Sequence, residues 1–274
     1  MTDPYAAFRL LHHGDRPLLL PNAWDHASAA ALAARGYPAI GTTSLGVAAA
    51  AGLPDGGAAT RSETLALARR LRGLPMLLTV DVEAGFSDGP AEVAALATEL
   101  AGLGVVGINL EDGRADGSLA PTVSAAAKVA AVKDAVPRLF VNARTDAWWL
   151  GVADPLPQAL ERAAAYRAAG ADGFFAPGVP DTDTIGLLVR EVGAPLNVLH
   201  RPGGPTVAEL ARLGVARIST GSLLFRAALG AALATMDDLR VAGGAASTTG
   251  NGTAAGGGGE PPSYAEVQRL SDRR

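Results

Sequence analysis

The sequence predicts an α/β fold: a single (β/α)₈ barrel of the TIM type with a C-terminal helical extension. Short apolar runs alternate with longer amphipathic segments, eight such pairs occur, and no G-x-G-x-x-G motif follows the first run. The alternation indicates parallel strands joined by crossover helices, and eight units favour closure of the sheet into a barrel. An open doubly wound sheet is the alternative, because it uses the same alternation.

The predicted elements follow one another along most of the chain. Strands are expected at Leu18–Pro21, Ala39–Thr43, Met76–Asp81, Val105–Glu111, Leu139–Ala143, Gly173–Ala176, Leu196–Leu199 and Ala216–Thr220. Helices are expected at Asp25–Arg35, Ser62–Arg72, Pro90–Leu103, Thr122–Ala135, Asp154–Ala169, Asp181–Val192, Thr206–Leu213 and Ser222–Leu239. Four of them end beside a glycine able to take the left-handed C-cap conformation, namely Gly36, Gly73, Gly170 and Gly214.

Three segments are distinguished by composition. Residues 1–241 form the predicted barrel, and residues 242–259 form a flexible linker rich in glycine and alanine. Residues 260–274 form a short helix or tail, in which Tyr264, Val267 and Leu270 share one side at helical spacing. A frayed tail and a helix that docks on a neighbouring subunit both remain open.

Composition excludes several classes of protein. The net charge is −4 and no basic run or basic–aromatic stripe occurs, so no nucleic-acid partner is expected. No signal-peptide pattern and no membrane-spanning apolar stretch is found. The chain has no cysteine, which excludes disulfides, thiolate metal sites and a cysteine nucleophile, and fits the cytoplasmic location that we expect.

Polar side chains gather at the ends of the predicted strands, where a barrel builds its active site. Asp81 and Glu83 are spaced i, i+2, so on an extended strand they point the same way. A shared cation or a bound water network explains such a pair, and two solvated loop acids are the alternative. The candidate ligands are hard oxygens, which favours Mg²⁺ or Mn²⁺ over Zn²⁺.

Glu111 and Arg144 end the next two predicted strands. They form either a structural ion pair at the barrel rim or part of the site, where a guanidinium would hold a small anionic substrate bidentately. The histidines at positions 12, 13, 26 and 200 are expected to be surface or packing residues, since no partner acid lies at a telling spacing.

Six motifs in order resemble the isocitrate lyase/phosphoenolpyruvate mutase superfamily, and the likeness runs from about Pro21 to Leu233. They are Thr43–Ala48, Gly52–Gly56, Asp81–Phe86, Asn109–Asp112, Asn142–Asp146 and Ala169–Gly178. The resemblance implies an enzyme that binds 2-oxo acids or enolpyruvate-type species and stabilises enolate charge with a metal and fixed donors.

The resemblance also implies roles for individual residues. Asp81 would bind Mg²⁺ directly, while Asp55, Glu83 and Glu111 would hold the water shell of the metal. Asp55 and Arg144 are the candidate catalytic residues, and Arg144 would clamp the substrate anion. Further substrate contacts are expected from Trp24, Ser44, Leu45, Gly46, Asp81 and Asn197.

Two positions depart from the pattern of the superfamily. The usual D-x-D reads Asp81-x-Glu83 here, and the extra methylene could let Glu83 reach the metal directly. The interval Gly113–Pro121 is short and lacks cysteine and histidine, whereas the lyase branch carries a proton-donating cysteine there. The sequence therefore leaves the general acid or base unidentified.

The functional prediction is a Mg²⁺-dependent enzyme, lyase-like toward C–C bonds, that acts on a small 2-oxo acid or its precursor. Phosphonopyruvate (P–C bond) or oxaloacetate decarboxylase-type chemistry is one alternative, and a non-catalytic 2-oxo-acid-binding protein is another. The resemblance further implies a homodimer or homotetramer in which subunits exchange the C-terminal helix.

Overall fold

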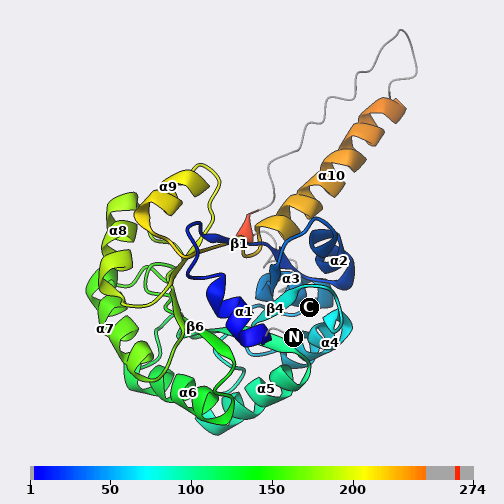
Figure 1. The fold of residues 1–274 in the computed structure, drawn as a ribbon. Coiled ribbons are helices and arrows are strands. Elements are labelled where there is room, and N and C mark those ends of the chain that lie inside the picture. The colour runs from blue at the N-terminus through cyan, green and yellow to red at the C-terminus, as the bar shows by residue number, and fades with distance from the viewer. Residues whose placement is uncertain (1–2, 245–262, 266–274) are drawn as a thin grey trace.

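The computed structural model describes residues 3–244 and 263–265. Its strands are all parallel and follow the order β1-β9-β8-β7-β6-β5-β4-β3-β2. β1 (Leu18–Leu20) pairs with β9, and β2 (Asn22–Ala23) pairs with β3, so the two short strands on either side of Pro21 close one barrel. The predicted (β/α)₈ barrel is confirmed (Figure 1).

The remaining strands agree with the predicted ranges to within one residue at either end. They are β3 (Ala39–Thr42), β4 (Leu77–Asp81), β5 (Val105–Glu111), β6 (Phe140–Arg144), β7 (Gly173–Phe175), β8 (Leu196–Leu199) and β9 (Arg217–Ser219). The helices are α1 (Pro4–Leu10), α2 (His26–Ala34), α3 (Ser44–Ala51), α4 (Arg61–Leu71), α5 (Pro90–Gly102), α6 (Thr122–Ala135), α7 (Pro155–Ala168), α8 (Thr182–Glu191), α9 (Val207–Leu213) and α10 (Leu223–Gly244). The four glycines expected after helices all have positive φ.

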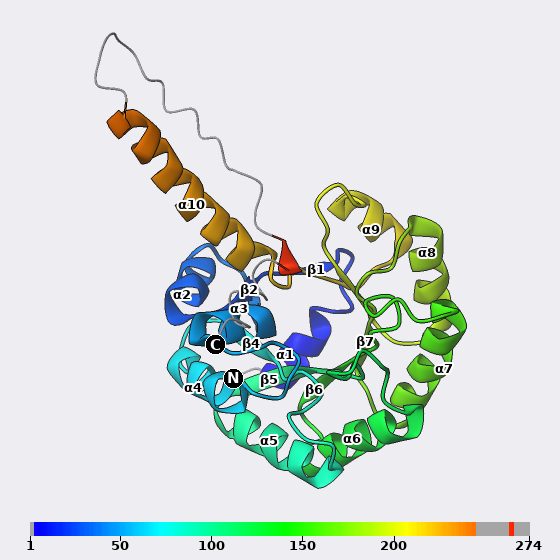
Figure 2. The same cartoon turned by 180° about the vertical axis from the view of Figure 1, so that it is seen from behind.

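Two helices were not predicted. Asp3 caps α1, whose first residue is Pro4, and Phe8 packs with Leu18 and Phe140 in a small core of its own. This helix lies across the end of the barrel at which the strands begin (Figures 1 and 2). α3 begins at Ser44, directly after β3, at the opposite end of the barrel. One end of the barrel is thus covered, and the other remains for a site.

The main core lies between the sheet and the surrounding helices. α10 departs from this arrangement, because it projects away from the ring formed by the other outer helices (Figure 2). Leu233, Met236 and Leu239 on it are more than half exposed. The helix continues to Gly244, three residues into the predicted linker 242–259, and the rest of that linker lies outside the described residues. Across the described ranges, no helix is long and apolar enough to span a membrane.

Candidate functional site

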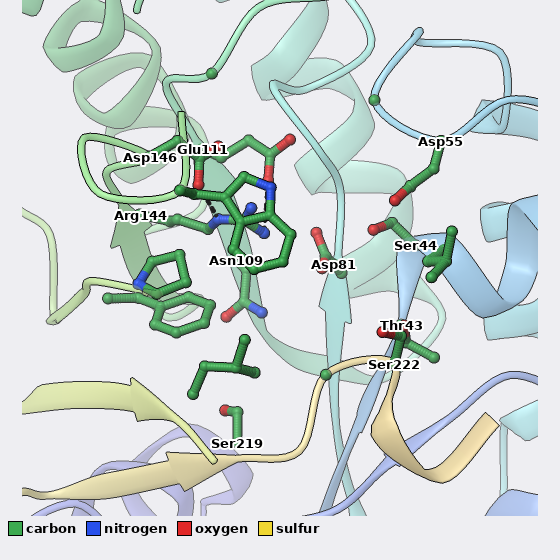
Figure 3. Close-up of a pocket in the computed structure, with 18 of the residues that line it drawn as sticks. Thr43, Ser44, Asp55, Asp81, Asn109, Glu111, Arg144, Asp146, Ser219 and Ser222 are labelled. Atoms are coloured by element: carbon green, nitrogen blue, oxygen red, sulfur yellow. Dashed lines mark hydrogen bonds and ion pairs between the residues drawn. The ribbon is translucent and has the colours of Figure 1, made fainter. Parts of the chain in front are cut away.

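A cavity opens where the strands of the barrel end. Residues from most of the strand ends line it, together with loops and the described C-terminal residue Tyr264 (Figure 3). Ser44 and Asp55 lie on one side, Glu111, Arg144 and Asp146 on the other, and Asp81 between them. The cavity therefore brings together most of the residues that the sequence predicts for the site.

Arg144, at the end of β6, is held by two carboxylates. Its NH1 atom lies 2.8 Å from Glu111 Oε2, and its Nε donates to Asp146 Oδ1 over 2.6 Å. All three side chains are largely buried, and the two acids raise the pKa of Arg144 well above its usual value although burial opposes them. The guanidinium also lies 5.6 Å from the ring of Phe175. A fixed cation thus faces the cavity, and its NH2 atom makes none of these contacts.

Asp81 ends β4, where its N–H donates to Thr42 Oγ1 at 2.9 Å. Burial raises the pKa of its carboxyl to about 6; Arg144 opposes the rise, and Asp55 and Asp146 add to it. Burial, partly opposed by Arg144, likewise raises the pKa of Glu111. A carboxylate crowded by other acids gains from a bound cation, since the cation offsets both the repulsion and the lost hydration.

The expectation that Glu83 points the same way as Asp81 is wrong. β4 ends at Asp81, and Glu83 has a left-handed backbone with φ of 50°, so the alternation of an extended strand does not continue. The Glu83 carboxylate accepts hydrogen bonds from Thr60 Oγ1 (2.6 Å) and Ala58 N (3.0 Å). It does not line the cavity, and it fastens the loop that carries Asp55. Its burial raises its pKa to about 7.

The N-terminus of α3 meets the cavity at Ser44 and Leu45. The N-cap residue Thr43 makes no side-chain capping bond, so the first N–H groups of this helix have no partner within the helix. Gly46 and Trp24 do not line the cavity, but they set the helix in place. A Cβ on Gly46 would lie 2.8 Å from Thr43 Cγ2 and from Trp24 Cβ, so the close approach of α3 requires glycine.

A polar layer lies beneath the cavity. Asn109 Oδ1 accepts hydrogen bonds from Asn142 Nδ2 (2.9 Å) and Arg217 NH2 (3.1 Å), which leaves its Nδ2 as the donor for a ligand. Asn197 lies in this layer, where its Oδ1 accepts from Ser219 Oγ, and it does not line the cavity. Arg217 is fully buried, and burial lowers its pKa to about 9.

Sequence reasoning left several cavity residues out of the predicted site. Asp146 and Asn109 belong to motifs that the resemblance used, so a signal for them was present. Trp149 also lines the cavity, although no motif of the predicted site includes it. Tyr264 gave no such signal: its hydroxyl donates to Asp55 Oδ2 at 2.5 Å, and its ring stands edge-on to Trp149 at 5.3 Å.

The donor set suits a hard divalent cation. Four carboxylates line the cavity, from Asp55, Asp81, Glu111 and Asp146, against the two guanidinium groups of Arg114 and Arg144. Among the described residues no three acids or histidines stand close enough to form a cage around a metal. Mg²⁺ needs no such cage, since it usually keeps several waters and takes one or two carboxylates. An arrangement in which Asp81 binds Mg²⁺ directly, and Asp55 and Glu111 accept hydrogen bonds from its water ligands, fits this coordination preference.

Comparison with known sequences identifies the family. A family model described as phosphoenolpyruvate phosphomutase matches residues 8–240. The uncharacterized protein Rv1998c of Mycobacterium tuberculosis is 46% identical over 226 residues, which cover 82% of this chain and 86% of that protein. The 2-methylisocitrate lyase of Bacillus subtilis is 32% identical over 198 residues, which cover 69% of this chain and 64% of the lyase.

Solved structures agree with this result. A proposed phosphonomutase from Burkholderia cenocepacia J2315 is 37% identical, with a TM-score of 0.78 over 88% of this chain and 99% of that one. A phosphonopyruvate hydrolase solved with oxalate and Mg²⁺ shares the fold at 22% identity, with a TM-score of 0.78 over 99% and 95% of the two chains. The chain belongs to the phosphoenolpyruvate phosphomutase family, within the isocitrate lyase/phosphoenolpyruvate mutase superfamily of lyases and mutases.

Proposed function

We propose that this enzyme is a Mg²⁺-dependent lyase that breaks or forms a C–C bond in a small 2-oxo acid or its precursor. The observation that carries the proposal is the placement of Arg144 across the cavity from Ser44, with Asp81 between them. The cavity thus offers a fixed cation and free helix N–H groups for an anion, beside a carboxylate for a metal.

The position of each residue in the cavity determines the role that we propose for it. The N–H groups of Ser44 and Leu45 and the NH2 atom of Arg144 would hold a substrate carboxylate, and Asn109 Nδ2 would donate from below. Asp81 would bind the metal, and Asp55 and Glu111 would orient its waters. Mg²⁺, when bound, supplies Lewis acidity that stabilises enolate charge. Glu111 and Asp146 keep the guanidinium of Arg144 in one orientation while the substrate binds.

A second candidate function is chemistry on phosphonopyruvate or decarboxylation of oxaloacetate. The loop of residues 113–121 favours it, because this loop offers no cysteine or histidine as a proton donor. Its one carboxyl group, on Asp116, has its pKa lowered by hydrogen bonds from Ser118, so it stays ionised at neutral pH. Under this second candidate, cleavage of isocitrate-like substrates, which in the lyase branch relies on a donor in this loop, should be very weak, whereas clear turnover of isocitrate or methylisocitrate would select the first candidate.

The test is a panel of isocitrate, methylisocitrate, oxaloacetate and phosphonopyruvate with Mg²⁺ present, together with calorimetric binding of oxalate. We expect oxalate to bind only with metal, and Arg144→Lys to weaken it, since an ammonium cannot reproduce a two-pronged contact. Turnover of oxaloacetate or phosphonopyruvate alone would select the second candidate. Oxalate binding without any turnover would indicate a binding protein, and oxalate binding unaffected by metal and by Arg144→Lys would contradict the proposed site.

A further inference from the structure

Tyr264 joins two sides of the cavity that are far apart in the sequence. Its hydroxyl donates to Asp55, in the loop after α3, and its ring packs edge-on against Trp149, in the loop after β6. The interplanar angle of 83° is the edge-to-face geometry that aromatic pairs favour. A buried tyrosine hydroxyl needs a polar partner, and the Asp55 carboxylate supplies a charged one. Tyr264 is therefore held at both ends.

A second cavity is lined in part by the same aromatic pair. Its lining includes Val179, Ile185 and Leu210, so it is largely apolar, and its charged or titratable lining residues are His200, Arg201 and Arg226 among those that the structure describes. Tyr264 and Trp149 line both cavities, and among the described residues only Leu199 and Ser222 are shared besides them. Tyr264 thus borders both an acidic space with anion-binding groups and an apolar space whose described lining residues include no carboxylate.

We propose that Tyr264 determines substrate specificity: its ring closes the acidic cavity toward the apolar one and limits the bound acid to a short chain. The inference rests on the proposed function, because it assumes that the acidic cavity binds a 2-oxo acid. An acid anchored at Ser44 and Arg144 would meet the Tyr264 ring with its far end. Removal of the ring would join the two cavities and offer apolar surface to a longer chain.

The test compares 2-oxobutanoate with 2-oxohexanoate, two acids that differ by two methylene groups, in calorimetry with Mg²⁺. The wild-type protein should bind the shorter acid more tightly. In Tyr264→Ala the two methylenes can be buried, which corresponds to a gain of roughly tenfold for the longer acid relative to the shorter one. Tyr264→Phe is the matched control: it keeps the ring and loses the hydroxyl, so it should retain the wild-type preference.

Oxalate separates the possible failures. If oxalate binds to all three proteins and the chain-length preference of Tyr264→Ala equals that of the wild type, the role of Tyr264 is refuted while the proposed function stands. If Tyr264→Phe changes the preference as much as Tyr264→Ala does, the ring is not the determinant and the inference is also refuted. If oxalate binds to none of them, the proposed function fails and this inference fails with it.

Discussion

Asp81 and Glu83 differ by two positions in the sequence and occupy different surroundings in the fold. Asp81 lines the cavity, whereas Glu83 accepts hydrogen bonds from Thr60 and Ala58. We therefore expect Asp81→Ala to lose Mg²⁺ affinity by more than the roughly 10–100-fold that outer-sphere changes cost. Glu83→Gln keeps an acceptor for Thr60 and should change the affinity much less. Calorimetric titration with Mg²⁺ checks both, and equal losses would contradict the placement of Glu83.

This pair also shows what sequence can predict at the residue scale. Asp81, Glu111 and Arg144 end three neighbouring predicted strands, and all three line one cavity, because the strand ends of a parallel barrel meet at one face. The direction of Glu83 depends on one backbone angle, φ of 50°, that a non-glycine residue seldom adopts. The i, i+2 rule assumes an extended backbone, so it fails where the strand has already ended.

His12 provides a pH-dependent prediction away from the site. Burial lowers its pKa to about 3, Arg217 and His13 add to the effect, and a hydrogen bond to Phe8 O opposes it. Between pH 3 and 6.5 the unfolded chain binds a proton at this position and the folded one does not. The contribution of the neutral, buried His12 to the free energy of unfolding is therefore fully present above pH 6.5. As the pH falls below that value, the free energy of unfolding decreases by about 1.4 kcal/mol per pH unit.

The measurement is urea unfolding at several pH values for the wild type, His12→Gln and His13→Gln. His12→Gln should remove this slope from the free energy of unfolding. The exposed neighbour His13 offers a matched control, and its variant should leave the slope in place. A wild-type slope that survives in His12→Gln would assign the acid sensitivity to other groups.

At the scale of elements, α3 is one of the two helices that the sequence did not predict. Its residues are almost all apolar, and Leu45, Gly46, Val47 and Ala48 are buried, so no polar face marks a helical period. The N-cap Thr43 makes no side-chain bond that a capping motif would have signalled. Helices such as α4 and α8 were predicted because apolar and charged residues alternate along them with helical period. α1 has seven residues and buries only Phe8. α9 is equally short, but its Thr206–Glu209 capping box and the following Gly214 mark both of its ends in the sequence.

The seating of α3 can be tested through its glycine. Gly46→Ala places a Cβ 2.8 Å from Trp24 Cβ and Thr43 Cγ2, and overpacking of this kind costs about 1–3 kcal/mol. Gly102→Ala is the control, because nothing lies within 4 Å of the added Cβ at the end of α5. Gly102→Ala should leave the free energy of unfolding unchanged or raise it by up to about 1 kcal/mol.

Urea unfolding measures both variants, and oxalate binding reports on the site. Because the N–H groups of Ser44 and Leu45 move with α3, Gly46→Ala should also weaken oxalate binding, whereas Gly102→Ala should not. A Gly46→Ala variant as stable as the wild type would contradict the close packing of α3 against Trp24.

At the scale of the whole molecule, the sequence predicted closure of the barrel, since eight strand–helix pairs allow few other topologies. It did not predict that Tyr264 reaches Asp55, because the two residues are 209 positions apart and a tail with no strong pattern precedes the contact. Contacts between regular elements follow from periodicity. A contact made by one aromatic side chain depends on three-dimensional shape, which periodicity does not encode.

The projecting helix α10 exposes an apolar face. It has 22 residues, a length of about 33 Å, and exposes Leu233, Met236 and Leu239 at i, i+3, i+6 spacing on one side. Such a face on a helix that leaves its own barrel suits exchange with a second copy, so we expect a dimer or tetramer at micromolar concentration by light scattering. Leu233→Glu should shift the protein toward monomer, because it buries a charge in the exchanged face. Ala231→Glu adds the same charge at an exposed position on the far side of α10 and should leave the mass unchanged. A monomeric wild type, or equal effects of the two variants, would show that this face does not join the subunits.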